Sequence, residues 1–333
     1  MYVAMRIALG TDQGTVILES RTKDDLLSWT FVSRAQQGRQ IRCLVESTNN
    51  SILATGAHGV VYKTKDYQNW MASTAGLEGQ NITSIGVHPS YPHIMYAGTT
   101  PPQMFFSDTA GLRWQQLDTF RHIPEAESWR FPLPPYRAKI TGILFHPQYS
   151  DIVLASLACG GLLGSLDCGI NWMERPLGIE REVNGITLHP LNPNRLFATT
   201  STGIYRSDDL GSSWVVLDNG LPYMYARCLT ISPGNPNFIM ACISQSRESS
   251  IQQMMIRSSD GGDTWEVCIN GLPDLTTQIV TCLDAIGDNC FAVGTSKGNV
   301  YLTSDGGQFW QHVHRDIAPI NAILLQDTSA GLT

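Results

Sequence analysis

The chain has 333 residues, of which 42% are hydrophobic and 15% charged, and its formal net charge is −7. This charge leaves no excess of Lys and Arg to displace counterions from a phosphate backbone, so a nucleic-acid partner is not expected. No stretch approaches the roughly eighteen apolar residues of a membrane span. The low charged fraction and the 30 Gly are typical of an all-β protein rich in turns.

The first residues predict strands. Met1–Leu9 has no basic segment followed by a long apolar core, so no export signal is expected and the sequence favours a cytoplasmic protein. Arg6–Leu9 and Thr15–Glu19 are predicted to be two strands joined by a Gly-rich turn, and Trp29–Ser33 a third.

A motif that ends in Trp recurs along the chain. Ser or Thr is followed by Asp at the second position after it, Gly at the fourth and Trp at the seventh. Complete copies occupy 165–172, 207–214, 258–265 and 303–310, and looser copies occupy 22–29, 64–70 and 107–114. The copy at Thr64 is one residue short, and the copy at Ser107 has Asp108 and then Thr109.

The spacing of the motif predicts the fold. The closing Trp residues stand mostly 41 to 45 residues apart, with two longer intervals of 58 and 51. A period in the forties with β signals is typical of propeller blades. In each copy the Asp can accept backbone N–H bonds of its own turn, the Gly supplies a positive φ, and the Trp begins the next strand and buries its ring. Seven copies predict one all-β, seven-bladed β-propeller over 1–333.

The repeat resembles the Asp-box (BNR) repeat of sialidases, two-propeller xyloglucanases, sortilin-type receptors and photosystem II assembly-factor propellers. The resemblance covers essentially the whole chain. It implies that each Asp-box is a structural turn between the third and fourth strands of a blade. The structural residues implied in this way are Asp24, Asp66, Asp167, Trp172, Asp209, Trp214, Asp260, Trp265, Asp305 and Trp310.

The two ends of the chain are predicted to share a blade. Only three strands are expected in the N-terminal blade, whereas the others have four. Ile320–Leu325 follows the last motif and resembles the predicted first strands of other blades, such as Ile82–Val87 and Ile140–Phe145. This C-terminal strand is therefore expected to complete the N-terminal blade, which closes the ring and removes its edge strands.

A second signal follows the first strand of several blades, in the form of His88-Pro89, His146-Pro147 and His189-Pro190. Because each His belongs to a different blade, a Pro-stiffened turn is favoured over a metal site. His312 and His314 share one face of a strand, but they would need a third ligand. We expect neither a metal nor another cofactor.

The face opposite the Asp-boxes is expected to carry the binding residues, because the two insertions, 118–139 and the rim loop 244–253, are predicted there. Trp129 is the only Trp outside the motif, and Trp, Tyr and Arg are enriched at binding hot spots. The alternative for the first insertion is a lid that packs on its own blade. Candidates in the two insertions are Arg121, Trp129, Arg130, Tyr136, Arg137 and Arg247. Candidates around the predicted channel mouth are Asp12, His58, Arg181, Tyr223, Tyr225, Lys297, His314 and Arg315.

Two functional interpretations follow. Glycoside hydrolysis needs two facing carboxylates, and no such pair stands out. The Arg-Ile-Pro string of sialidases is interrupted at Arg121-His122-Ile123-Pro124. The photosystem II assembly-factor propellers are single binding rings, but their export and basic patch are not matched. We expect a non-catalytic scaffold that binds a protein or another ligand on the face opposite the Asp-boxes. The alternative is an enzyme that acts on a small molecule or glycan at the channel mouth.

Overall fold

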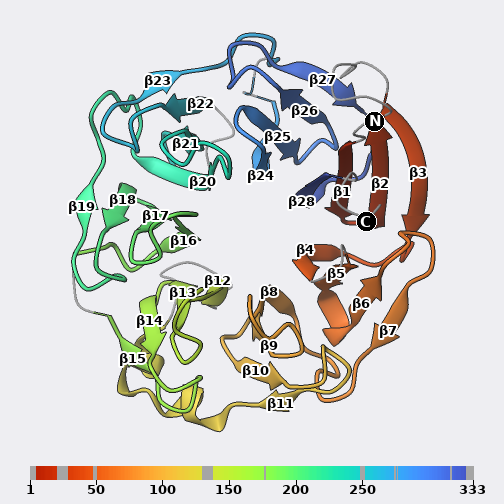
Figure 1. The fold of residues 1–333 in the computed structure, drawn as a ribbon, viewed down its shortest axis with the longest axis vertical. Helices are drawn as coiled ribbons and strands as arrows, with labels where there is room; N and C mark the ends of the chain where they lie inside the picture. Colours follow the sequence, from red (N-terminus) through yellow and green to blue (C-terminus); the bar gives the residue numbers. More distant parts are fainter. Residues whose placement is uncertain are drawn as a thin grey trace. The chain divides into compact units, whose positions relative to one another are not determined.

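The structure, a computed structural model, describes residues 5–20, 29–47, 51–129, 138–175, 178–247, 252–273, 275, 277–315 and 317–327, without the side chains of Arg121 and Glu125. In this part of the chain 28 strands form seven four-stranded antiparallel sheets, with three short 3-10 helices between them. This confirms the predicted all-β, seven-bladed β-propeller. Figure 1 shows the blades as separate groups of strands. No helix in the described ranges is long and apolar enough to cross a membrane.

The blades follow chain order, and each has its first strand at one side and its fourth at the other. Blade one contains β28 (Ile320–Asp327), β1 (Met5–Thr11), β2 (Gly14–Ser20) and β3 (Trp29–Ala35). Blade two contains β4 (Ile41–Ser47), β5 (Ser51–Gly56), β6 (Val61–Thr64) and β7 (Met71–Ser73), with the helix η1 (Ala57–Gly59). Blade three contains β8 (Ile82–Val87), β9 (Met95–Thr99), β10 (Met104–Ser107) and β11 (Gln115–Gln116).

The remaining blades repeat this arrangement. The helices η2 (Asp118–His122) and η3 (Pro124–Ser128) precede blade four, which contains β12 (Lys139–Phe145), β13 (Val153–Ala158), β14 (Gly161–Ser165) and β15 (Met173–Glu174). Blade five contains β16 (Val183–Leu188), β17 (Leu196–Thr200), β18 (Gly203–Ser207) and β19 (Val215–Val216). Blade six contains β20 (Tyr225–Ile231), β21 (Ile239–Ser244), β22 (Gln253–Ser258) and β23 (Glu266–Val267). Blade seven contains β24 (Val280–Ile286), β25 (Cys290–Thr295), β26 (Val300–Thr303) and β27 (Gln311–His314).

Contacts divide the chain into two compact units. The first unit comprises 1–54, 63–70 and 217–333, and the second comprises 55–62 and 71–216. Blades one, six and seven belong to the first unit, and blades three, four and five to the second.

The repeated turn has the geometry that its residues predict. In blade four the Ser165 hydroxyl donates to Asp167 at 2.8 Å and accepts the Gly169 N–H at 2.8 Å. The Asp167 carboxylate accepts the Asn171 N–H at 2.8 Å, and the Trp172 indole N–H donates to the Gly169 carbonyl at 2.9 Å. Except in blade one, the fourth strand begins one residue after the Trp rather than at it.

The other copies of the motif show which side chain accepts the backbone N–H in each turn. Asp209, Asp260 and Asp305 accept the same two kinds of bond in their own turns. In the copy at Ser107, the Thr109 hydroxyl accepts the Arg113 N–H at 2.9 Å in place of the carboxylate. In the short copy, Asp66 accepts the Asn69 N–H at 2.8 Å. Asp24 lies outside the described residues.

The His-Pro turns are held by their own imidazoles. The Nδ1 atom of His88 accepts the N–H groups of Ser90 and Tyr91 at 3.1 and 3.0 Å. His146 and His189 accept the two equivalent N–H groups of their turns. This bonding agrees with the predicted role of these residues in the turn. It involves Nδ1 of each imidazole and not Nε2.

The C-terminal strand completes blade one, as predicted. β28 pairs with β1 from Met5 opposite Asp327 to Thr11 opposite Ile320. Its side chains Ile320, Ile323 and Leu325 join a buried cluster with residues of blades one and seven. The side chain of Gln326 accepts the Tyr67 hydroxyl at 3.0 Å and donates to Glu46 at 2.7 Å, so polar contacts add to the strand pairing.

The closing strand β28 also contacts a titratable side chain, that of Asp284. The Asp284 carboxylate on β24 accepts the Leu325 N–H at 2.7 Å, and removal from water raises the pKa of Asp284 to about 7. Because its folded pKa lies above the unfolded value, Asp284 favours folding most at low pH, and this contribution is lost as the pH rises from about 4 to about 7. Asp284→Asn should therefore gain stability relative to the wild type across that interval, by at least about 1 kcal/mol. Urea unfolding of both proteins at pH 4, 6 and 8 measures the difference, and a difference independent of pH would contradict this account.

Candidate functional site

Asp12, predicted to lie at a binding face, makes side-chain hydrogen bonds to other residues of the first unit. Its Oδ1 accepts the Gln40 side-chain amide at 2.7 Å and the Asn321 side-chain amide at 2.9 Å. These bonds connect the β1–β2 turn with the residue before β4 and with the closing strand. The observed contacts of Asp12 are therefore those of a residue that fixes the closure.

Two predicted residues, Tyr225 on β20 and Arg247 in the rim loop, are brought together by Arg227. The Arg227 guanidinium lies 5.3 Å from the centroid of the buried Tyr225 ring and donates to the Arg247 carbonyl at 2.7 Å. The start of the rim loop is thus bound to β20 by Arg227. The Arg247 side chain is exposed.

The other candidates of the first unit are Tyr223 before β20, Lys297 after β25, and His314 at the end of β27 with Arg315 next to it. Lys297 and Arg315 are exposed, Tyr223 is partly buried, and His314 accepts the Arg315 N–H at its Nδ1 atom at 3.0 Å. No group of three or more His, Cys, Asp or Glu among the described residues is arranged to hold a metal ion.

A pocket of about 380 Å³ lies at the far end of the rim loop in the first unit. Its lining comes from 252–254 at the start of β22 and from the segment 269–275. The Gln253 side chain donates to the Gln278 carbonyl at 2.9 Å and accepts the Val280 N–H at 3.1 Å, so it joins β22 to the beginning of blade seven.

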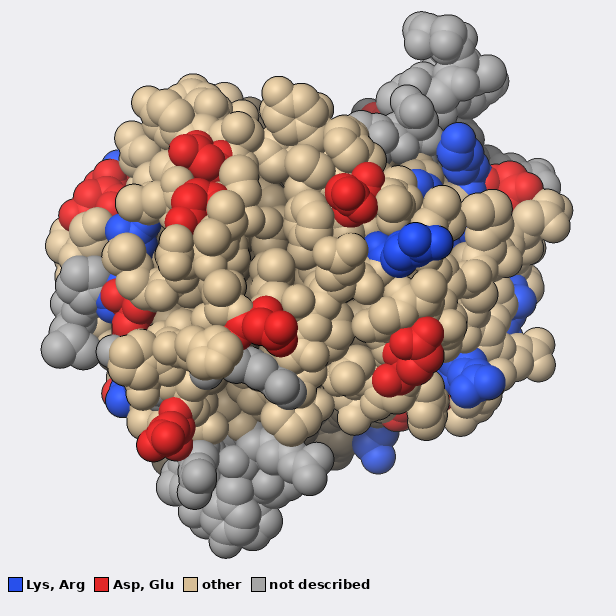
Figure 2. Space-filling view, turned by 90° about the horizontal axis from the view of Figure 1, so that it is seen from below, with Lys and Arg blue, Asp and Glu red and all other residues tan. Residues whose placement is uncertain are grey.

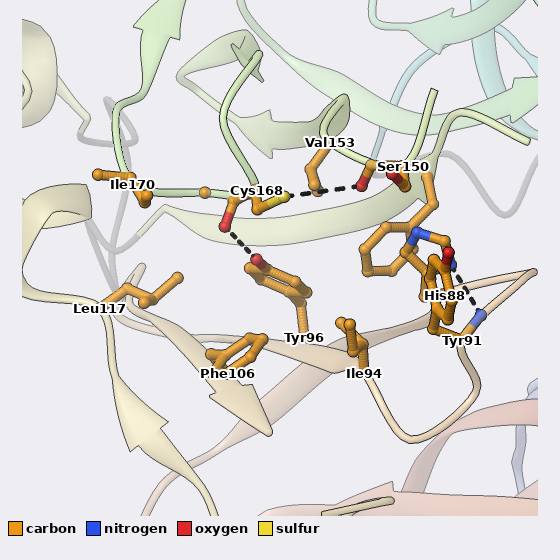
Figure 3. A pocket seen from close by; sticks show the side chains of 12 residues that line it. His88, Tyr91, Ile94, Tyr96, Phe106, Leu117, Ser150, Val153, Cys168 and Ile170 are labelled. Atoms are coloured by element: carbon orange, nitrogen blue, oxygen red, sulfur yellow. Dashed lines mark hydrogen bonds between the residues drawn. The ribbon is translucent and has the colours of Figure 1, made fainter. Parts of the chain in front are cut away.

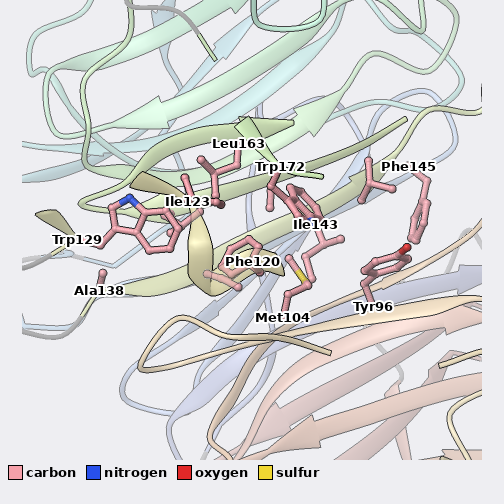
Figure 4. Close-up of a cluster of buried hydrophobic side chains, with 14 residues drawn as sticks. Tyr96, Met104, Phe120, Ile123, Trp129, Ala138, Ile143, Phe145, Leu163 and Trp172 are labelled. Carbon is pink, nitrogen blue, oxygen red and sulfur yellow. The ribbon is translucent and has the colours of Figure 1, made fainter. Parts of the chain in front are cut away.

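The described part of the first insertion packs on its own blade. Phe120, Ile123 and Trp129 are 0%, 5% and 7% exposed. The Phe120 ring lies 5.5 Å from Trp129 and 5.4 Å from Trp172, and Figure 4 shows the three rings in one cluster. A binding role for Trp129 stays a prediction, but its observed contacts are those of a core anchor.

The remaining candidates belong to the second unit. Arg181 is exposed, donates to the Ser128 hydroxyl at 2.9 Å and lies 3.8 Å from Glu174, so it holds the end of η3. His58 is exposed with a φ of 68°. The side chain of Arg121, and all of Arg130, Tyr136 and Arg137, lie outside the described residues.

The second unit contains an apolar pocket of about 330 Å³ between blades three and four, shown in Figure 3. The His88 turn, β9 and β10 form one wall, and β12, its following turn and the Ser165–Trp172 turn form the other. Its lining residues are His88, Tyr91, Ile94, Tyr96, Phe106, Leu117, Phe145, Ser150, Val153, Cys168, Gly169 and Ile170. None of these was predicted as a site residue, and the pocket lies at the turns expected to be purely structural.

Aromatic contacts make the pocket wall rigid. The Tyr96 ring lies 5.4 Å from Phe106 and 5.3 Å from Phe145, both edge to face. The His88 ring lies 5.1 Å from Phe145 and 5.0 Å from Tyr91. Such pairs stabilise a fixed arrangement of rings beyond their burial.

The polar groups of the wall are largely engaged. The Tyr96 hydroxyl donates to the Cys168 carbonyl, and its burial raises its pKa, so it stays protonated. Burial lowers the pKa of His88 and favours its neutral form, whose Nδ1 already accepts two N–H bonds. The His88 Nε2 atom is buried and makes no hydrogen bond of ordinary geometry. Partial removal of the thiol from water, and then the charges of Asp151 and Asp167, raise the pKa of the exposed Cys168, which disfavours its nucleophilic thiolate.

Gly169 brings the turn of blade four close to Tyr96. Its φ is +78°, and a Cβ there would lie 2.8 Å from the Tyr96 ring. Both the backbone conformation and this contact therefore require glycine. The same residue that completes the repeated turn thus sets the distance between the two pocket walls.

The fold and this pocket define a seven-bladed β-propeller with an apolar site between adjacent blades. Solved structures with a similar fold include an ancestral GH74 enzyme, at 15% identity and a TM-score of 0.62 over 84% of this chain and 39% of that one. This chain therefore spans about two fifths of that enzyme's length. Another is YCF48 bound to D1 peptide, at 16% identity and a TM-score of 0.56 over 82% of this chain and 80% of that one.

At these identities the likeness concerns the fold alone. No family model and no curated protein matches the sequence.

Proposed function

We propose that this protein is a non-catalytic binding propeller of the Asp-box kind that recognises a protein partner. The observation that carries the proposal is the composition of the pocket between blades three and four. It is an apolar pocket of about 330 Å³, and its described lining residues include no carboxylate, Lys or Arg. Ligand sites are typically concave and apolar, whereas glycoside hydrolysis needs two carboxylates that flank the bond.

The bonding of the wall residues supports binding rather than catalysis. A general acid or base must exchange a proton with the substrate, but Tyr96 donates to Cys168 and the Nδ1 of His88 is occupied. The peptide bound by YCF48 is consistent with a protein partner, because that protein has the same kind of fold. The loops on the face opposite the Asp-boxes remain a second predicted contact surface for the same partner.

The alternative is the hydrolase interpretation, which the likeness to the GH74 enzyme favours. It places a glycan or small molecule at the channel mouth. The alternative predicts measurable turnover of a substrate, whereas the proposal predicts none.

Affinity capture from native lysate tests the proposal, combined with an assay of chromogenic glycosides. We compare the wild type with Ile94→Trp, which fills the pocket, and with a variant whose residues 121–136 are replaced by a Gly-Ser linker. Ile152→Trp is the matched control, because Ile152 and Ile94 each donate their N–H to the Tyr of their own turn, and only Ile94 lines the pocket.

We expect a stoichiometric protein partner that the Ile152→Trp variant retains, and no glycoside turnover. Loss of the partner with one of the other two variants would assign the interface to the pocket or to the insertion. Glycoside turnover by the wild type without a protein partner would contradict the proposal.

A further inference from the structure

We infer that the pocket between blades three and four receives one aromatic or large aliphatic side chain of a peptide segment whose neighbouring residues are Lys or Arg. The inference rests on the proposed binding function and specifies the chemistry of the partner. It uses only residues of the second unit.

The size of the pocket fits a single anchor side chain. Its volume is about 330 Å³, and an apolar cavity of about 150 Å³ is already large enough to bind benzene. The rings of Tyr96, Phe106 and Phe145 line the pocket, so an incoming ring would pack against other aromatic rings. Few polar groups line it, so an apolar side chain is preferred to a charged one.

The apolar surface continues outside the pocket, which favours a peptide over a free small molecule. Tyr91 and Ile170 line the pocket and are still 50% and 61% exposed. Binding interfaces often place one buried anchor among weaker surrounding contacts, and these two side chains supply part of the surroundings.

Two acidic residues adjoin the pocket lining, Asp151 next to Ser150 and Asp167 next to Cys168. Their charges act on the Cys168 thiol at the pocket wall. Hydrogen bonds from Asn171 and Ser165 lower the pKa of Asp167, so it stays ionised at neutral pH. Figure 2, seen from the side where β11 and β15 lie in Figure 1, shows acidic side chains standing among mostly uncharged residues. Basic residues beside the anchor would therefore be attracted.

The experiment uses the full chain and labelled synthetic peptides. The probes are Lys-Gly-Trp-Gly-Lys, the same peptide with Ala in place of Trp, the same peptide with both Lys replaced by Glu, and free indole. Fluorescence anisotropy gives Kd for each labelled peptide, and competition gives it for indole. Alkylation of Cys168, the only exposed cysteine of the eight, reports where the peptide lies.

We expect the Lys-Gly-Trp-Gly-Lys peptide to bind about tenfold or more tightly than either altered peptide at low salt. Added salt should shrink the difference between the Lys and Glu peptides, because exposed charges are screened. At ten times Kd the peptide should slow Cys168 alkylation about tenfold. Ile94→Trp should lose at least about tenfold in affinity, whereas Ile152→Trp should stay within about twofold of the wild type.

The inference is overturned if no peptide binds, if the Ala peptide or indole binds as tightly as the Trp peptide, or if Ile94→Trp binds like the wild type. A partner captured from lysate by both Ile94→Trp and the wild type would sustain the binding function while this inference fails. Glycoside turnover without a partner would instead remove the proposed function itself.

Discussion

Removal of residues 319–333 is expected to abolish the folded monomer. The deletion takes away β28, which pairs with the whole of β1 and supplies three side chains to the buried cluster between blades one and seven. It also removes the Gln326 contacts to Tyr67 and Glu46. β1 would be left as an unpaired edge, which is a template for association with another chain.

The matched control for this prediction is a deletion of 328–333 alone, which leaves β28 intact. Size-exclusion chromatography with light scattering and thermal unfolding should show a wild-type-like monomer for the short deletion. The long deletion should give aggregates or a dimer paired through the exposed edges of β1, and a synthetic peptide of 319–333 should restore the monomer. A monomeric long-deletion protein with unchanged stability would contradict the closure by β28.

Trp172→Ala is expected to destabilise the protein by about 3–5 kcal/mol, because it removes a buried aromatic ring and leaves a cavity. Trp172 is 8% exposed, contacts Phe120 edge to face at 5.4 Å, and donates its indole N–H to Gly169. The substitution should therefore loosen both the repeated turn and the described part of the first insertion. Equilibrium urea unfolding measures the loss.

Trp214→Ala is the comparison for Trp172→Ala, because Trp214 closes the same turn in blade five but is only partly buried and its indole N–H has no partner in the described structure. We expect a smaller loss for that variant. An unchanged unfolding midpoint for Trp172→Ala would show that the Trp of the repeat is not a core residue.

Much of the fold could be predicted because the same local chemistry recurs in each blade. The Asp and Gly positions define the turn. The copy at Ser107 shows that the Asp position needs a hydrogen-bond acceptor, because Thr109 there accepts the N–H bond that Asp accepts in other copies. The closing strand was predictable because Ile320–Leu325 has the apolar pattern of Ile82–Val87. The first strands of blades three and four begin at Ile82 and Lys139, within one residue of the predicted starts.

The pocket between blades three and four was harder to predict from the sequence. Tyr96 and Cys168 are 72 positions apart and meet only because the turn of one blade packs over the preceding blade. The available signal was the apolar content of turns predicted to be structural, such as Ile170 after Gly169 and Tyr91 after His88-Pro89. Trp129, the Trp outside the repeat, was a weaker guide to the site. Its residue type is common at binding hot spots, but its contacts are those of a core residue.

Amide hydrogen exchange of the wild-type chain, with and without the captured partner, tests the central claim most directly. If the partner binds in the pocket between blades three and four, protection should rise in 88–96, 146–153 and 165–172. These segments contain the turns that line the pocket. Protection confined to 118–129 or 244–253, with these three segments unchanged, would contradict the account.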